Sequence, residues 1–206
     1  MTQSRTRPLL STGLAILSAW LMLGVPSVAT AENALEAAPD LETATATPEE
    51  ELARAFTQLK SEDEATWRQA QITIEKLWSR SGSASMDLLL ERGRQAMARE
   101  EIDKALEHFT DLVRLSPGFA EGWNARATAH FVNGDMGAAM ADIIETLSLE
   151  PRHFGALTGL GTILEQIGDE RNAIKAFRDA LALHPHLEGP QEAVKRLAPS
   201  ADGRDA

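Results

Sequence analysis

A repeat of 34 residues is the feature of this sequence that most restricts its fold. Proline recurs at Pro117, Pro151 and Pro185, and other columns keep the same interval over three copies. A fixed period of this length is typical of architectures in which similar units stack, because no single unit can bury its own apolar face. Besides proline, the repeated columns are Gly93, Ala127 and Gly161; Ala105, Ala139 and Ala173; Phe109, Ile143 and Phe177; and Leu115, Leu149 and Leu183.

These columns predict two helices in each copy. The Gly or Ala column falls in the middle of the first helix and the invariant alanine opens the second, so the two helices can approach closely. The Phe or Ile packs one turn after that alanine. Gly134-Asp135 and Gly168-Asp169 predict a helix end with positive φ followed by an aspartate cap, whereas the first copy has Glu100-Glu101 there. Proline cannot continue a helix, so the second helix of each copy ends before it.

The columns resemble those of the tetratricopeptide repeat (TPR) family. On this resemblance the copies cover residues 86–119, 120–153 and 154–187, and the middle copy has the family's tryptophan at Trp123. The resemblance implies an all-α fold: a right-handed α-solenoid of stacked helix–turn–helix repeats. It also implies a scaffold that binds partners, since the family is not tied to one ligand.

Two arginines depart from the family pattern. Arg92 and Arg126 stand where the family usually has a buried leucine. We expect both to reach solvent through their flexible stems. The alternative is pairing with acids such as Asp111, Asp142 or Glu145, because an unpaired buried guanidinium would be very costly.

In the TPR family the first helices of the repeats line a concave groove. Carrying the family's contact positions over to this sequence gives a surface of apolar side chains with Asn, Thr and Gln around them, which suits an extended peptide or an amphipathic helix. The alternative is that Met97 and Phe131 pack inward, or against a preceding hairpin that fills the groove. The candidate partner-binding residues are Leu90, Arg94, Met97, Glu121, Asn124, Thr128, Phe131, Val132, Thr158, Thr162, Glu165 and Gln166.

One TPR subgroup grips the C-terminal carboxylate of heat-shock chaperones with two lysines, an arginine and two asparagines. At the matching positions this sequence has a single base, Arg94, beside Leu90, Ala125, Gly155 and Gly159. We therefore expect no such clamp here.

The first 31 residues have the pattern of a secretory signal peptide. Arg5 and Arg7 precede an uncharged apolar run over residues 9–25, and Ala29-Thr30-Ala31 supplies a small-residue cleavage site. We expect Sec-type export to the periplasm and no membrane contact after cleavage. The alternative is a retained N-terminal anchor, for which the run is short. Residues 32–47 are then an acidic linker, too poor in apolar side chains to fold.

Two helical segments flank the predicted repeats. Residues 48–82 predict a helical hairpin, because Thr47 and Pro48 suit a helix start and apolar residues recur at helical spacing, including a stripe of Trp67, Gln71, Ile74 and Trp78. Residues 188–197 predict a short capping helix, and residues 198–206 a flexible tail.

Composition excludes several classes of function. The 206 residues include no Cys and carry 31 Asp and Glu against 20 Lys and Arg, a net charge of −11. Thiol chemistry is therefore excluded, and binding to nucleic-acid phosphates is not expected. The sequence has no glycine-rich phosphate loop, no H-E-x-x-H and no G-x-S-x-G. We predict a non-catalytic protein of the bacterial envelope, without cofactor or metal, that binds a protein or peptide.

Three histidines, His153, His184 and His186, fall in equivalent loops after the second and third repeats. We expect them to be solvated loop residues. The alternative is a metal-binding or enzymatic envelope protein in which the three imidazoles hold a divalent ion.

Overall fold

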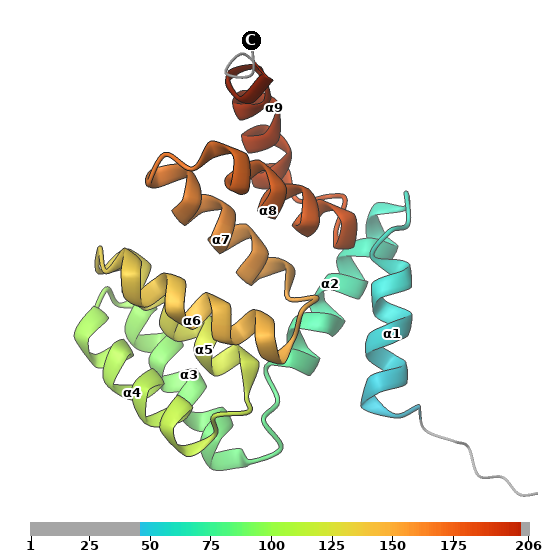
Figure 1. Ribbon diagram of the computed structural model, residues 1–206. Coiled ribbons are helices and arrows are strands. Elements are labelled where there is room, and N and C mark those ends of the chain that lie inside the picture. Colours follow the sequence, from blue (N-terminus) through green and yellow to red (C-terminus); the bar gives the residue numbers. More distant parts are fainter. Residues whose placement is uncertain (1–45, 203–206) are drawn as a thin grey trace, which may run out of the picture. The chain divides into compact units, whose positions relative to one another are not determined.

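The computed structural model describes residues 46–202, and over this range the chain forms nine α-helices and no strand (Figure 1). The predicted signal peptide over residues 1–31 and most of the predicted linker lie outside the described residues, as does the end of the predicted tail. None of the described helices is long and apolar enough to cross a membrane.

Six consecutive helices form three pairs that correspond to the three predicted repeats. The two helices of each pair pack against each other, and successive pairs stack, α4 on α5 and α6 on α7 (Figure 1). The all-α repeat solenoid predicted from the period of 34 is therefore confirmed. The helices are α3 (Ala84–Ala98), α4 (Ile102–Leu115), α5 (Ala120–Val132), α6 (Met136–Leu149), α7 (Phe154–Gln166) and α8 (Glu170–Leu183).

The glycine column marks where the two helices of a repeat come closest. A Cβ atom on Gly93 would lie 2.2 Å from the ring of Phe109, and one on Gly161 would lie 2.6 Å from the ring of Phe177. The middle repeat has the larger alanine in the glycine column and the smaller isoleucine in the phenylalanine column. A gain of volume in one helix is thus matched by a loss in its partner, as close packing requires.

The turn inside each repeat needs a left-handed backbone. Gly134 has a φ of 85° and Gly168 a φ of 83°, as predicted. In the first repeat the same conformation falls on Glu100, with a φ of 59°. A side chain is disfavoured in this region, because its Cβ atom crowds the following carbonyl oxygen.

The predicted aspartate caps form at one of the two sites. The Asp169 side chain accepts a hydrogen bond from the backbone N–H of Asn172, at 3.3 Å. Asp135 also occupies the cap position, but its carboxylate accepts from the side chain of Asn133, at 2.7 Å. A nearby amide donor therefore replaces the backbone as the partner of Asp135.

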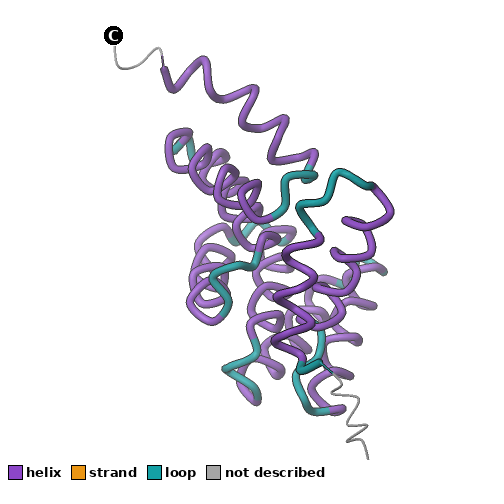
Figure 2. Tube along the Cα trace, turned by 90° about the vertical axis from the view of Figure 1, so that its right-hand side faces the viewer, coloured by secondary structure: helices purple, strands orange, loops and turns teal. Residues whose placement is uncertain are grey.

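The predicted N-terminal hairpin consists of α1 (Pro48–Gln58) and α2 (Glu64–Trp78) (Figure 2). A capping box opens α1: the Thr47 hydroxyl accepts from the N–H of Glu50, and the Glu50 carboxylate accepts from the N–H of Thr47.

The last described helix, α9 (Glu188–Asp202), packs on α8. The predicted helix end at residue 197 was wrong, and the tail predicted from residue 198 is helical over residues 198–202. That end was taken from the last residue of the apolar face, Leu197, whereas the helical backbone continues beyond it.

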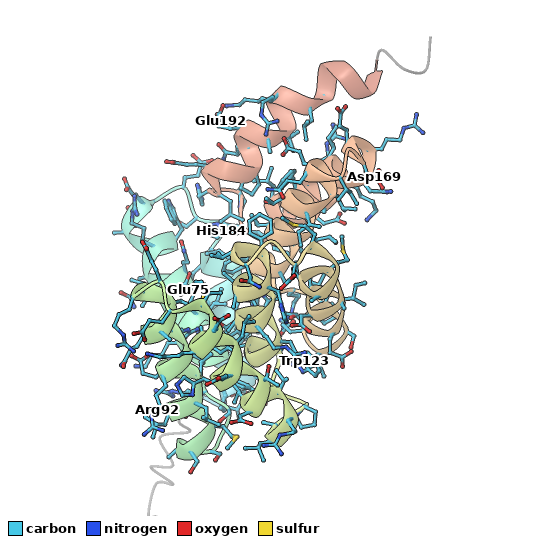
Figure 3. All side chains as sticks on the ribbon, turned by 90° about the vertical axis from the view of Figure 1, so that its left-hand side faces the viewer. Glu75, Arg92, Trp123, Asp169, His184 and Glu192 are labelled. Carbon is cyan, nitrogen blue, oxygen red and sulfur yellow. The ribbon has the colours of Figure 1, made fainter. Side chains whose placement is uncertain are left out.

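The two arginines that replace a leucine differ from each other. Arg92 is exposed, as expected (Figure 3). The guanidinium of Arg126 instead makes two 2.8 Å hydrogen bonds to the buried carboxylate of Asp142 and lies 4.9 Å from the ring centre of Trp123. The expectation of a solvated side chain was wrong for Arg126, because Asp142 supplies the two-point pairing that a partly buried guanidinium requires.

Candidate functional site

The inner helices α3, α5 and α7 bring eight of the twelve predicted groove residues to the walls of three adjoining cavities. One cavity lies between α3 and α5 and has a volume of about 200 Å³. A second lies between α5 and α7 and has a volume of about 260 Å³. The third, of about 440 Å³, lies between these helices and α2. The eight residues are Arg94, Met97, Glu121, Asn124, Thr128, Phe131, Thr158 and Thr162.

The cavity between α5 and α7, called the α5/α7 pocket below, has no charged side chain in its lining. Its apolar side chains belong largely to the repeat core. Carrying over the family's contact positions missed them, because those positions give the outward residues of the groove and not its floor. The floor and wall residues missed in this way are Ala127, Ile143, Gly159 and Ile163.

The three threonines of the α5/α7 pocket offer the groove fewer hydrogen-bond donors than their residue type suggests. The hydroxyls of Thr128, Thr158 and Thr162 each donate to the carbonyl four residues earlier, at 3.0, 2.8 and 3.0 Å. Since each hydroxyl has only one hydrogen, these side chains offer a ligand a methyl group and acceptor lone pairs.

Asn124 borders all three cavities. Its amide nitrogen donates one hydrogen bond to the Glu121 carboxylate, at 3.2 Å. A side-chain amide has two N–H groups and an accepting oxygen, so one donor and the acceptor have no partner among the described residues. Asn124 can therefore pair with both groups of a peptide unit.

A buried ion cluster closes one side of the groove. Glu121, with 9% of its surface exposed, forms an ion pair with Arg94 and lies 3.0 Å from Nε2 of His153. Burial raises the pKa of the Glu121 carboxyl, but the hydrogen bond from His153 and the charge of Arg94 outweigh it and lower that pKa below its usual value. Glu121 is thus ionised, and Arg94 is already paired.

The remaining four predicted groove residues lie elsewhere. Leu90 is buried in the core of the first repeat, packed with Phe109 and Leu112. Val132 is exposed at the end of α5 and Gln166 is the last residue of α7, and neither borders any of the three cavities described above. Glu165 forms an ion pair with Arg196 of α9.

The three histidines predicted to be solvated instead contact the N-terminal hairpin, with His153 and His184 buried and His186 half-buried. The ring of His153 stacks on Trp78 with centres 4.2 Å apart, and that of His186 stacks on Trp67 at 4.7 Å. His153 and His184 are 3% and 1% exposed. The expectation of solvated loops was wrong because the hairpin covers them, and the Trp67-to-Trp78 stripe was the sequence signal of that contact.

His184, which Figure 3 labels, has the smallest exposed fraction of the three histidines. Its Nε2 lies 3.1 Å from the side-chain oxygen of Gln71, so this nitrogen carries the hydrogen. Burial, with a smaller contribution from the charge of His186, lowers the pKa of His184 to about 4. Over residues 46–202 no three His, Asp or Glu side chains converge to hold a metal ion. The three histidine rings instead pack between the repeats and the N-terminal hairpin.

The hairpin borders the groove at one end without filling it. From α2, Ile72, Glu75, Lys76, Trp78 and Ser79 line the third cavity, called the α2 chamber below. None of them lines the α5/α7 pocket. Phe131 lines that pocket, and Met97 packs on the core of the first repeat.

Sequence comparisons agree with this architecture. Profiles described as Tetratricopeptide repeat match residues 90–146 and 154–186. A TPR repeat-containing protein of Rhizobium etli is 37% identical over 163 residues, which cover 78% of this chain and 79% of that relative. The chain belongs to the tetratricopeptide repeat family.

Solved TPR structures share the fold. A structure described as the first TPR of Spaghetti bound to an HSP90 peptide has a TM-score of 0.55 at 18% identity, and it covers 57% of this chain and 93% of its own. The Arabidopsis OM64 TPR domain has a TM-score of 0.53 at 25% identity, with coverages of 55% and 93%.

Proposed function

We propose that this TPR protein is a non-catalytic interaction scaffold of the bacterial cell envelope that binds a peptide segment or helix of a partner protein in its groove. The observation that carries the proposal is the α5/α7 pocket, an open cavity with an apolar floor and no charged lining. Such a pocket accepts an apolar anchoring side chain, the kind of contact that dominates the affinity of peptide complexes. The peptide-bound TPR domain of similar fold supports a peptide as the class of partner.

The groove chemistry argues against an acidic chain terminus as the ligand. Arg94 is the single base among the positions that match the chaperone-binding clamp, and it is paired with Glu121. A second carboxylate at this point would have to compete with a buried, ionised one. We therefore propose an uncharged apolar anchor.

The envelope location is proposed from residues 1–31, which have the pattern of a Sec-type signal peptide. N-terminal sequencing of the protein recovered from a periplasmic fraction tests it. A mature chain beginning at Glu32 supports export and cleavage. A full-length chain in the membrane fraction supports the retained anchor, and one in the cytosol contradicts both.

Filling the α5/α7 pocket tests the interaction itself. Peptides are selected on the chain from a phage-displayed library of random linear peptides, and their Kd values are measured by fluorescence anisotropy. Thr162→Phe places a ring in the pocket and is expected to raise Kd at least about tenfold, a loss of ~1.4 kcal/mol.

Thr57→Phe on α1 is the matched control for this variant. Thr57 is exposed and its hydroxyl makes the same bond to the carbonyl four residues earlier as that of Thr162. We expect an unchanged Kd for the control and unchanged helical content for both variants. Equal Kd values for Thr162→Phe and the unaltered chain would contradict the assignment of the groove.

A further inference from the structure

We infer that helix α2 of the N-terminal hairpin is part of the partner-binding surface: a bound segment continues from the α5/α7 pocket into the α2 chamber and contacts Ile72. This inference rests on the proposed function. The sequence of the hairpin predicts only an added pair of helices. The inference gives this pair a role in recognising the partner.

The cavities form one path with Asn124 at its centre. The α2 chamber and the α5/α7 pocket share Asn124 and Gly155 in their linings. Gly155 has no side chain to separate the two spaces. A segment lying across this junction brings its backbone to the amide of Asn124, whose free donor and acceptor match one peptide unit.

Ile72 is exposed where an apolar partner could cover it. Its side chain is 56% exposed, although it borders the α2 chamber beside Trp78 and Phe154. The hairpin core is built without it, from Leu59, Ile74 and their neighbours. A single exposed isoleucine is common on any surface. Its position on the wall of a cavity that continues the groove is what points to a partner.

The hairpin wall is held by the groove residues themselves. Arg94 donates to the Ser79 hydroxyl at 3.1 Å, and the Glu121 carboxylate binds His153, on which Trp78 stacks. The contacts that fix the charges of the groove therefore also fix the end of α2. A partner meets a preformed wall, so little ordering of the hairpin opposes binding.

The charges of the chamber define the chemistry of the occupant. Arg94 and Glu121 neutralise each other. From α2 the chamber receives Glu75 and Lys76, adjacent residues of opposite sign. No net charge is left to select a charged ligand. The partner is an extended segment with two apolar side chains, one for the α5/α7 pocket and one for Ile72, and with uncharged residues between them.

The same selected peptides test the role of α2. Ile72→Ser removes the apolar contact from the chamber, and Ile144→Ser is its control, since Ile144 is 59% exposed on α6 and lines none of the three cavities. We expect Ile72→Ser to raise Kd by about tenfold, as for an apolar contact at the centre of an interface. The control is expected to leave Kd unchanged, and both variants to keep the unfolding midpoint.

Peptide variants identify which residue meets Ile72. Each apolar residue of the peptide is replaced in turn by serine, and binding is measured with the unaltered chain and with Ile72→Ser. One replacement is expected to lose most of its effect in the Ile72→Ser chain, since the contact is already absent.

The outcomes separate this inference from the proposed function. An unchanged Kd for Ile72→Ser together with weak binding by Thr162→Phe overturns the role of α2 and leaves the groove standing. Unchanged Kd values for both variants, or a library that yields no binding peptide, overturn the proposed function and this inference with it. Selected peptides that share an acidic C-terminus contradict the uncharged occupant.

Discussion

Glu100 has the backbone conformation that glycine has in the other two repeat turns. A residue with a Cβ atom is disfavoured there by about 1 kcal/mol relative to glycine. Glu100→Gly is therefore expected to raise the free energy of unfolding by up to about 1 kcal/mol. The gain is reduced by the larger conformational entropy that glycine gives the unfolded chain. Urea denaturation measures the change.

The reverse change, from glycine to a residue with a Cβ atom, can be made at the equivalent turn of the third repeat. Gly168→Ala puts a Cβ atom at a φ of 83° and is expected to lower the free energy of unfolding by about 1 kcal/mol. A Glu100→Gly chain no more stable than the unaltered one would mean that contacts of the Glu100 side chain offset the backbone cost.

The Gly161 contact reverses the usual effect of alanine in a helix. Alanine normally stabilises a helix interior by about 0.5–1 kcal/mol relative to glycine. At Gly161 the new Cβ atom would meet the buried ring of Phe177 at 2.6 Å, so we expect a net loss of about 1–2 kcal/mol. Thermal unfolding of Gly161→Ala checks the sign.

Gly137→Ala on α6 is the control for Gly161→Ala, because no neighbouring atom lies within 4 Å of its added Cβ. It is expected to be neutral or stabilising by about 0.5 kcal/mol. In a Phe177→Ile background, Gly161→Ala should cost less, since the pair then matches that of the middle repeat. Additive effects of the two changes would contradict the packing argument.

The residue patterns predicted the structural roles of positions that recur in every repeat. They did not predict the contacts of positions that occur in only one repeat. The glycine and alanine columns and the turn glycines follow from spacing alone, since their roles are local to one repeat. The partner of Arg126 did not follow, because Asp142 lies on the next helix and several acids were within the same reach in sequence. The floor of the α5/α7 pocket was likewise hidden among residues that the pattern assigned to the core.

At the scale of elements, the hairpin contact makes stability depend on pH. The pKa of His184 is lowered from 6.5 to about 4 in the folded chain, chiefly by burial. Between these values the unfolded chain binds a proton that the folded chain does not. The contribution of His184 is therefore fully present above pH 6.5 and is lost as the pH falls toward 4, by up to about 3 kcal/mol.

His184→Gln removes this titration. We expect the stability of the variant to fall less between pH 6.5 and pH 4 than that of the unaltered chain, although it is lower near pH 7 because packing on Phe154 is lost. His108→Gln on α4 is the control and should keep the full pH dependence. Parallel curves for His184→Gln and the unaltered chain would exclude His184 as the titrating group.

Hairpin docking shows why element positions were harder to predict than the elements themselves. Helical spacing and the Thr47 cap predict both hairpin helices. Their place against the His153 and His184 loops depends on contacts between aromatic rings from segments far apart in the chain. Periodicity within one segment contains no information about such a partner, although the Trp67-to-Trp78 stripe showed that one face of α2 needed cover.

At the scale of the whole described chain, the repeat array needs a cover at its C-terminal end. Helix α9 supplies it by burying Ala193 and Leu197 against Ile174 and Phe177 of α8. A chain truncated after Leu187 is expected to be less stable by several kcal/mol and to self-associate, because this apolar face is then open. Denaturation and analytical ultracentrifugation measure the two effects.

A chain that ends at Asp202 controls for truncation as such, since it keeps all of α9. It is expected to match the full chain in stability and to remain in the same oligomeric state. A monomeric, equally stable chain lacking α9 would show that the array needs no cover.

The contacts of the hairpin also determine the order in which parts of the chain fold. Nε2 of His186 donates to the Ser61 carbonyl across a sequence separation of 125 residues, and Nε2 of His184 donates to the Gln71 side-chain oxygen across 113. Each repeat can pair its helices locally, whereas these contacts close most of the chain into a loop and form slowly. The hairpin is therefore synthesised first and docked last. Until the third repeat has emerged, Trp67 remains without its partners His184 and His186, and the α2 wall of the groove is incomplete.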